Sequence, residues 1–219
     1  MKIERLTKKY GEKVVLDDLS LTVARGETLC VLGRSGAGKT TLLNSIAGLC
    51  EFEGRIEGAE SVSYVFQTSR LVPWLTVREN LRFAGGRCEL IDGFLQQAGI
   101  LELAEQRVSR LSGGEARRVA IVQAFLSSAP VTLLDEPFIY LDSATKAEMI
   151  ELFCKLQKQE EKAVVFVTHD LDEAIAMGNR AAVLRGGKIC FETALGGETP
   201  REYGAESAAR EALMRELKM

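Results

Sequence analysis

The sequence contains one histidine and one tryptophan among 219 residues, and none of its five cysteines forms a Cys-x-x-Cys pair. Widely separated cysteines with a single histidine exclude a zinc module and a disulfide framework. The cysteines are therefore expected to be reduced and buried, where they pack like small apolar side chains. They are Cys30, Cys50, Cys88, Cys154 and Cys190.

Long apolar runs and a strong net charge are also missing. The longest apolar candidates, residues 131–134 and 163–167, fall far short of the roughly 20 residues that a membrane-crossing helix needs. The first residues contain no secretory apolar segment, so we expect a cytoplasmic protein that meets a membrane only through a partner. A net charge of −3 argues against nucleic-acid binding, which usually needs a basic patch.

Strands and helices alternate along the chain, which predicts one α/β domain. Helices are predicted at residues 40–49, 115–127 and 143–161, and residues 75–106 are rich in helix formers. In the tail, Thr199, Pro200 and Glu202 combine an N-cap, a first-turn proline and a capping box. They predict a helix starting there, with apolar residues such as Ala205 and Leu217 on one face, which docks on the body or binds a partner. Strands are predicted at residues 2–6, 19–23, 28–32, 61–66, 131–134, 163–168, 181–184 and 188–192.

The clearest motif is Gly33-Arg34-Ser35-Gly36-Ala37-Gly38-Lys39-Thr40, which matches the phosphate-binding loop in full and stands between a strand and a helix. Glycines let backbone N–H groups curl around phosphate oxygens, and the helix start adds the positive end of its dipole. Lys39 is expected to reach the β- and γ-phosphates and Thr40 to bind Mg²⁺. Thr41 follows as a further nucleotide-binding residue.

Polar residues end three predicted strands. Asp135 and Glu136 follow residues 131–134, where Asp135 is expected to hold Mg²⁺ and Glu136 to act as general base for water. Gln67 and His169 end two other strands, at the edge where ligand-facing residues of parallel sheets collect. We expect Gln67 to bind metal or water and His169 to be catalytic, although a lone histidine is more often structural.

The pentapeptide Leu111-Ser112-Gly113-Gly114-Glu115 has no role in a solitary phosphate-loop enzyme, although Ser-Gly-Gly at a helix start presents amides to an anion. With it, nearly the whole chain closely resembles the nucleotide-binding subunits of ABC transporters. The resemblance implies a RecA-like P-loop core over residues 1–78 and 128–219, with an N-terminal antiparallel β subdomain, and a helical subdomain bearing the signature over residues 79–127. It also implies a head-to-tail homodimer in which residues 112–115 of each subunit cover the ATP of the other.

The resemblance assigns further roles. Tyr10 matches the aromatic residue that stacks on adenine, and Asp142 matches the D-loop aspartate, while Gln67, Asp135, Glu136 and His169 match the Q-loop, Walker B, catalytic and switch residues. Implied ligands and partners are ATP, Mg²⁺, a membrane permease on whose cytoplasmic face the subunit sits, and a solute-binding protein. Residues 67–80 are most similar to importer subunits for nitrate, sulfonate or taurine. Four apolar residues there form a groove for a permease helix or pack the helical subdomain: Leu71, Val72, Trp74 and Leu75.

Three features depart from the family pattern. Ile139 and Tyr140 replace the small residues that often precede the D-loop. Arg117 and Gln123 replace the usual glutamine and arginine after the signature, which predicts rewired polar contacts between the lobes. The chain also ends soon after the ATPase core, so no appended regulatory domain is expected.

Two rival classes differ in what they need. A non-transport ABC ATPase of DNA repair or translation usually carries a coiled coil, a zinc module or paired ATPase domains, and the sequence shows none of them. A stand-alone P-loop kinase or GTPase does not require the signature, and no Asn-Lys-x-Asp motif for guanine is present.

Overall fold

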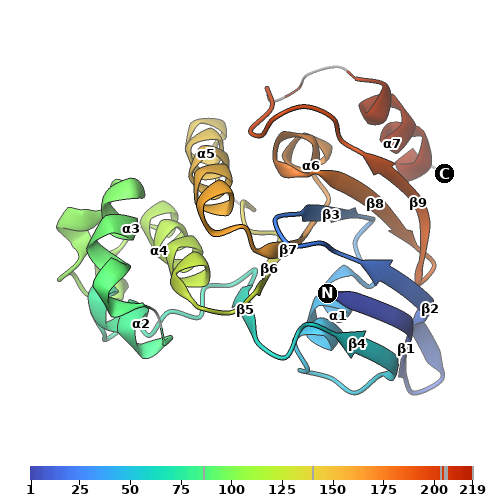
Figure 1. Ribbon diagram of the computed structural model, residues 1–219, viewed down its shortest axis with the longest axis horizontal. Coiled ribbons are helices and arrows are strands. Elements are labelled where there is room, and N and C mark those ends of the chain that lie inside the picture. The colour runs from blue at the N-terminus through green and yellow to red at the C-terminus, as the bar shows by residue number, and fades with distance from the viewer. Residues whose placement is uncertain (86, 140, 203, 205–206, 219) are drawn as a thin grey trace.

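The computed structural model describes residues 1–85, 87–139, 141–202, 204 and 207–218. Two sheets organise this part of the chain (Figure 1). The first is antiparallel, in the order β2-β1-β4, and consists of β1 (Lys2–Tyr10), β2 (Lys13–Thr22) and β4 (Glu53–Glu57). The second has the order β5-β6-β7-β3-β8-β9, parallel except for β9. Its strands are β3 (Thr28–Leu32), β5 (Val62–Val65), β6 (Val131–Asp135), β7 (Ala163–Thr168), β8 (Arg180–Arg185) and β9 (Lys188–Ala194).

Helices α2, α3 and α4 lie together at one end of the molecule, and α7 lies at the other (Figure 1). The predicted α/β fold, with an N-terminal antiparallel sheet and a helical part that bears the signature, is confirmed. The helices are α1 (Lys39–Ile46), α2 (Val77–Phe83), α3 (Ile91–Gln97), α4 (Gly113–Leu126), α5 (Ser143–Glu160), α6 (Leu171–Met177) and α7 (Ala208–Lys218), with single 3-10 turns at Cys88–Leu90, Leu101–Leu103 and Val108–Arg110. No helix in the described ranges has the length and apolar character to cross a bilayer.

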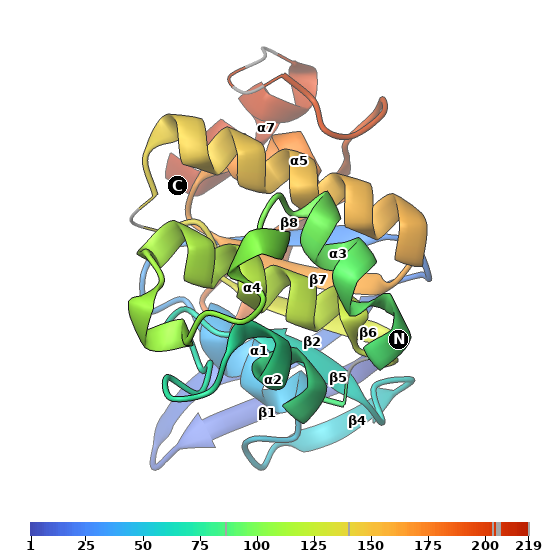
Figure 2. The same cartoon turned by 90° about the vertical axis from the view of Figure 1, so that its left-hand side faces the viewer.

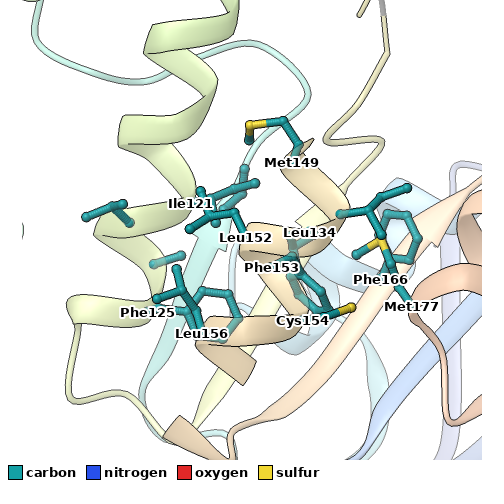
Figure 3. Close-up of a cluster of buried hydrophobic side chains, with 14 of the residues drawn as sticks. Ile121, Phe125, Leu134, Met149, Leu152, Phe153, Cys154, Leu156, Phe166 and Met177 are labelled. Atoms are coloured by element: carbon teal, nitrogen blue, oxygen red, sulfur yellow. The ribbon is translucent and has the colours of Figure 1, made fainter. Parts of the chain in front are cut away.

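Strands β3, β6 and β7 are buried along their whole length, which is why they read as continuous apolar runs. One face of the large sheet packs against α4 and α5, whose side chains interlock in Figure 3. There Phe125 of α4 and Phe153 of α5 meet edge to face with ring centroids 5.5 Å apart. The other face packs against α1 and the antiparallel sheet, and Figure 2 shows α1 on the side of the sheet away from α5. Covered on both faces, the sheet leaves its strand ends for a site.

The tail differs from the prediction. Helix α7 begins at Ala208, and residues 199–202 are not helical. The guanidinium of Arg201 donates hydrogen bonds to five backbone carbonyls, and these tertiary bonds override the local helix-start pattern. The acceptors belong to Ile175, Gly178, Leu195, Gly196 and Gly197. Helix α7 docks on the body through the buried Leu213, while Ala205 lies outside the described residues.

Three further features differ from what the sequence analysis predicted. Cys88 and Cys190 are exposed, so the expectation that all five cysteines are buried is wrong for these two. Strand β4 was not predicted, because its glutamates and arginine face solvent on a mostly exposed edge strand. Helix α6 was also not predicted, since seven residues give too short an apolar period to recognise.

Lys162, between α5 and β7, binds the carboxyl end of α4. Its buried Nζ donates to the carbonyls of Ala124, at 3.0 Å, and Ser127, at 2.5 Å. Burial lowers the pKa of the Lys162 ammonium to about 8 from its usual 10.5. The unfolded chain therefore binds more protons than the folded protein between these two pH values, and the contribution of Lys162 to stability rises with pH across that window.

We expect Lys162→Met to remove this rise. The free energy of unfolding of the wild type minus that of the variant should increase by roughly 1–3 kcal/mol from pH 8 to pH 10.5, measured by urea denaturation. Lys158→Met, at an exposed position of α5, is the control and should give a flat difference. A flat difference for Lys162→Met as well would contradict the burial of its charge.

Candidate nucleotide-binding site

The phosphate loop runs from the end of β3 to the start of α1, and glycine is required at both of its ends. A Cβ on Gly33 would lie 2.7 Å from the carbonyl oxygen of Leu184 on β8, so only glycine lets the loop pack against that strand. Gly38 is the N-cap of α1 with a φ of 104°, and a Cβ there would meet the Val15 carbonyl oxygen at 3.1 Å. The fold of this chain itself therefore requires both glycines.

A cavity of about 550 Å³ opens over this loop. It brings together most of the predicted site, since Gln67, Glu136 and His169 join the loop residues in its wall. The full lining is Val15, Ser35, Gly36, Gly38, Lys39, Thr40, Thr41, Gln67, Glu136, Ile139 and His169. Gly33, Arg34 and Ala37 face a second hollow of about 390 Å³ between the loop, β8 and the end of α7.

Lys39 is the cation at the centre of the cavity. Only 6% of the side chain is exposed, and its Nζ donates to the loop carbonyls of Gly33, at 2.8 Å, and Arg34, at 3.4 Å. The same Nζ lies 3.5 Å from Oε1 of Glu136. A buried ammonium held over glycine-rich backbone is a site for phosphate oxygens.

Asp135 ends β6 beneath the cavity, and its Oδ1 accepts a hydrogen bond of 3.3 Å from Oγ1 of Thr40. Burial raises the pKa of the Asp135 carboxyl, because removal from water disfavours its charged form more than the hydrogen bond from Thr40 favours it. Tyr64, which the sequence analysis missed, lies beside this carboxylate and donates to Oδ1 of Asn44 at 3.3 Å. A buried carboxylate next to a hydroxyl is the oxygen donor set that Mg²⁺ prefers, so Thr40 and Asp135 fit that ion.

Glu136 has a left-handed backbone, with φ at 44°, which is rare and strained for a residue with a side chain. Its N–H donates to the carbonyl of Val167 on β7 at 3.0 Å, which holds this conformation. The turn directs the carboxylate into the cavity, where Oε2 lies 3.0 Å from Nδ1 of His169. A carboxylate in this position can accept a proton from a bound water.

A second group of residues that the sequence analysis missed holds the backbone next to His169. Nζ of Lys146, on α5, contacts Asp170 at 2.8 Å and Glu173 at 2.7 Å. Glu173 in turn accepts a hydrogen bond of 2.7 Å from Oγ1 of Thr168. These contacts fix the backbone on both sides of His169. The available signal was Asp170, which caps α6 as an aspartate at a helix start is expected to do.

The signature residues and Asp142 do not line the cavity. Ser112 is the N-cap of α4 in a capping box with Glu115, whose carboxylate accepts the Ser112 N–H at 2.7 Å. Asp142 likewise caps α5. A Cβ on Gly113 would have no atom within 4 Å, so the fold of this chain does not require glycine there.

Two further predicted positions also lie apart from the cavity wall. Tyr10 ends β1 with half of its side chain exposed, and the Lys8 ammonium stands 4.8 Å from its ring centroid. Of the two bulky residues before the D-loop, Ile139 lines the cavity, and Tyr140 lies outside the described residues.

The two kinds of glycine can be separated by substitution. We expect Gly33→Ala to lower the free energy of unfolding by about 1–3 kcal/mol, since its methyl group would overlap the Leu184 carbonyl. Gly113→Ala should change it by less than about 0.5 kcal/mol, because the added methyl group meets nothing. Urea denaturation of the isolated subunit measures both. Equal losses would show that the signature glycine serves its own protomer's fold.

Comparison with known proteins agrees with this geometry. A family model described as ABC transporter matches residues 16–139, which contain the phosphate loop, the signature and the Asp135–Glu136 pair. The aliphatic sulfonates import ATP-binding protein SsuB 1 of Pseudomonas fluorescens is 38% identical, over 97% of this chain and 83% of its own length. The corresponding SsuB 2 of Rhodococcus jostii is 39% identical, over 93% and 86%.

Two solved structures resemble the fold closely. The dimeric structure of MJ0796, a bacterial ABC transporter cassette, aligns with a TM-score of 0.76 at 30% identity, over 90% of this chain and 99% of that one. A dimeric post-hydrolysis state of the same cassette, bound to ADP and Pi, aligns with a TM-score of 0.75 at 32% identity and the same coverage. The resemblance predicted from the sequence is thus confirmed, and the chain belongs to the ABC transporter family.

Proposed function

We propose that this chain is the ATP-binding and ATP-hydrolysing subunit of an ABC importer. The observation that carries the proposal is the meeting of Lys39, Thr40, Glu136 and His169 in one cavity over the phosphate loop, with Asp135 hydrogen-bonded to Thr40. A cation, a strained carboxylate and an imidazole at this spacing suit hydrolysis of a bound phosphoanhydride.

The residues divide the work as follows. Loop amides and Lys39 bind the phosphates, and Tyr10 stacks on the adenine. Thr40 and Asp135, with Gln67, would hold Mg²⁺, which neutralises phosphate charge when it is bound. Glu136 accepts the proton of the attacking water, while His169, 3.0 Å from Glu136, and Lys39 stabilise charge that develops on the γ-phosphate.

The site is completed, in this proposal, by a second copy of the chain. Ser112, Gly113 and Gly114 present backbone amides at the start of α4, away from their own cavity, and the fold leaves room for a side chain at Gly113. Glycine at that position is explained if a partner's nucleotide approaches the backbone there. ATP then favours the closed homodimer because it contacts both protomers only in that state. Asp142 belongs to the same contact surface.

Glu136→Gln tests the shared site. With the general base removed, hydrolysis should fall at least about 100-fold and an ATP-bound dimer should accumulate, measured by light scattering in ATP-Mg²⁺. The double variant Glu136→Gln/Lys39→Ala is the control and should stay monomeric, because it loses the phosphate contact. A Glu136→Gln subunit that binds ATP as a monomer would contradict the shared site.

The surface that receives the permease is proposed to include Trp74. Its side chain is 71% exposed, whereas Leu71 is buried in the core of the helical part. The sequence analysis gave this apolar stretch two alternative roles, packing of the helical subdomain or contact with the permease, and its residues divide between them. Leu71 packs inward, and Trp74 is free to contact a helix of a membrane partner. This partner would keep the subunit at the cytoplasmic face of the membrane.

Trp74→Ala should lower uptake of the transported solute at least tenfold in cells that carry the variant in place of the wild type, because a large aromatic contact is lost. ATP hydrolysis by the isolated subunit should stay within twofold, since Trp74 does not line the nucleotide cavity. Phe83→Ala, at an equally exposed position, is the control for nonspecific effects. Normal uptake by Trp74→Ala would exclude Trp74 from the docking surface.

The transported solute is proposed to be an aliphatic sulfonate, delivered to the permease by a solute-binding protein. The proposal is supported by the names of the two relatives, both aliphatic sulfonate import proteins, which also favour transport over DNA repair or translation. Nitrate and taurine, which the sequence analysis grouped with sulfonates, are small anionic or zwitterionic solutes of related kind. Their discrimination lies with the partners that contact the solute.

A further inference from the structure

Arg117 lies on α4, five positions after the N-cap Ser112, and reaches across to the end of β5. Its Nη1 donates to the carbonyl of Phe66 at 2.9 Å, and its Nη2 donates to the carbonyl of Gln67 at 2.7 Å. The planar fork of the guanidinium thus spans two consecutive peptide groups. Among the described residues no carboxylate lies within ion-pair distance of Arg117, so these carbonyls are its partners.

The carbonyls that Arg117 holds stand where the ladder of β5 has ended at Val65. Carbonyl groups beyond the end of a strand need other hydrogen-bond donors, and the charged guanidinium of Arg117 donates to these two. Gln67 is also part of the cavity wall. One residue is therefore attached by its carbonyl to the signature helix and faces the nucleotide cavity.

The chain that follows Gln67, as far as Asn80, is also bonded to α4. Gln123, the second departure from the family pattern, donates to the carbonyl of Asn80 at 3.2 Å. The Asn80 side chain accepts from the N–H of Val72 at 2.7 Å and donates to the carbonyl of Thr76 at 2.9 Å. Arg117 and Gln123, which both depart from the family pattern, thus form hydrogen bonds with opposite ends of residues 66–80.

The middle of the segment is bound to the chain just before the signature. The N–H of Val108 donates to the carbonyl of Leu75 at 3.0 Å, and that of Ser109 donates to Pro73 at 2.9 Å. Residues 67–76, which we term the Q segment, are therefore fastened to α4 and its approach at several points.

We propose that Arg117 is a positioning residue that couples the nucleotide cavity to the signature helix by holding the backbone of Gln67. The proposal rests on the ATPase function above. When nucleotide contacts shift Gln67, the Arg117 fork carries that shift into α4 and the Q segment together. Glutamine, the residue that the family usually has here, carries two N–H donors on a single uncharged amide nitrogen, whereas Arg117 binds the two carbonyls through separate nitrogens of a charged group.

Trp74 provides the reporter, since it is the only tryptophan of the chain, lies in the Q segment and is 71% exposed. The experiment uses the full chain in a Glu136→Gln background, which prevents turnover, and follows Trp74 emission and hydrogen exchange of residues 67–76 as ATP-Mg²⁺ is added. In the parent protein both signals should respond to ATP. In Arg117→Gln the ATP-dependent amplitudes should fall at least fivefold, while the Kd for ATP, measured by calorimetry, stays within threefold.

Arg118→Gln is the matched control. Arg118 is the next residue of α4 but contacts Glu148 and the carbonyl of Ala98 instead of the Q segment, so the parent amplitudes should be retained. With Glu136 present, Arg117→Gln should lower kcat about tenfold and change KM less than threefold. Arg117→Lys, which keeps the charge without the fork, should give amplitudes between those of the parent and Arg117→Gln.

Two outcomes would overturn the proposal. In the first, Trp74 emission and hydrogen exchange of residues 67–76 do not respond to ATP in the parent protein. In the second, the ATP-dependent amplitudes of Arg117→Gln equal those of Arg118→Gln. If circular dichroism shows that Arg117→Gln is unfolded, Arg117→Lys decides, and parent amplitudes in that variant overturn the proposal. A wild-type chain that neither binds nor hydrolyses ATP would instead refute the proposed function, which separates the two failures.

Discussion

The parallel register of three buried strands is the constraint on which the site depends. In the hydrogen-bonded order β6-β7-β3, Asp135 pairs with Val167, and Leu32 pairs with Thr168. The phosphate loop, Glu136 and His169 directly follow these positions, so the hydrogen bonding between the strands alone places them at one edge of the sheet. Packing of α4 and α5 on one face and α1 on the other fixes this register, because a shift of one residue would move every side chain of the shifted strand to the opposite face, into a core that other side chains already fill.

The sequence predicts best where burial is complete and local pattern and tertiary structure agree. Strands β3 and β7 were predicted at their full bounds, since every position is buried and apolar or small, and the phosphate loop follows from its glycine spacing. The prediction fails where one long side chain decides the backbone, as Arg201 does for the tail. It also fails for β4, an edge strand with charged side chains. The contacts of Lys146 and Arg117 join residues far apart in sequence, and no local pattern specifies such partners.

The groups with the least favourable local environment gather at the candidate site. Glu136 has a strained backbone and Asp135 is a buried carboxylate, while Lys39 lies within reach of Glu136. The strain and the buried charge oppose folding, and both residues stand at the end of the buried strand β6. This pattern is expected where stability is exchanged for reactivity. The signature residues, by contrast, form a regular capping box at the start of α4, which suits the partner contact proposed for them.

The five-carbonyl contact of Arg201 has a consequence for how the molecule can vary. It binds the segment after β9 to the end of α6, so the chain is fastened there before α7 begins. Helix α7 follows this anchor and makes its own contact with the body through the buried Leu213. None of the five carbonyls that Arg201 binds belongs to α7, so a change within that helix leaves the junction of β9 and α6 in place.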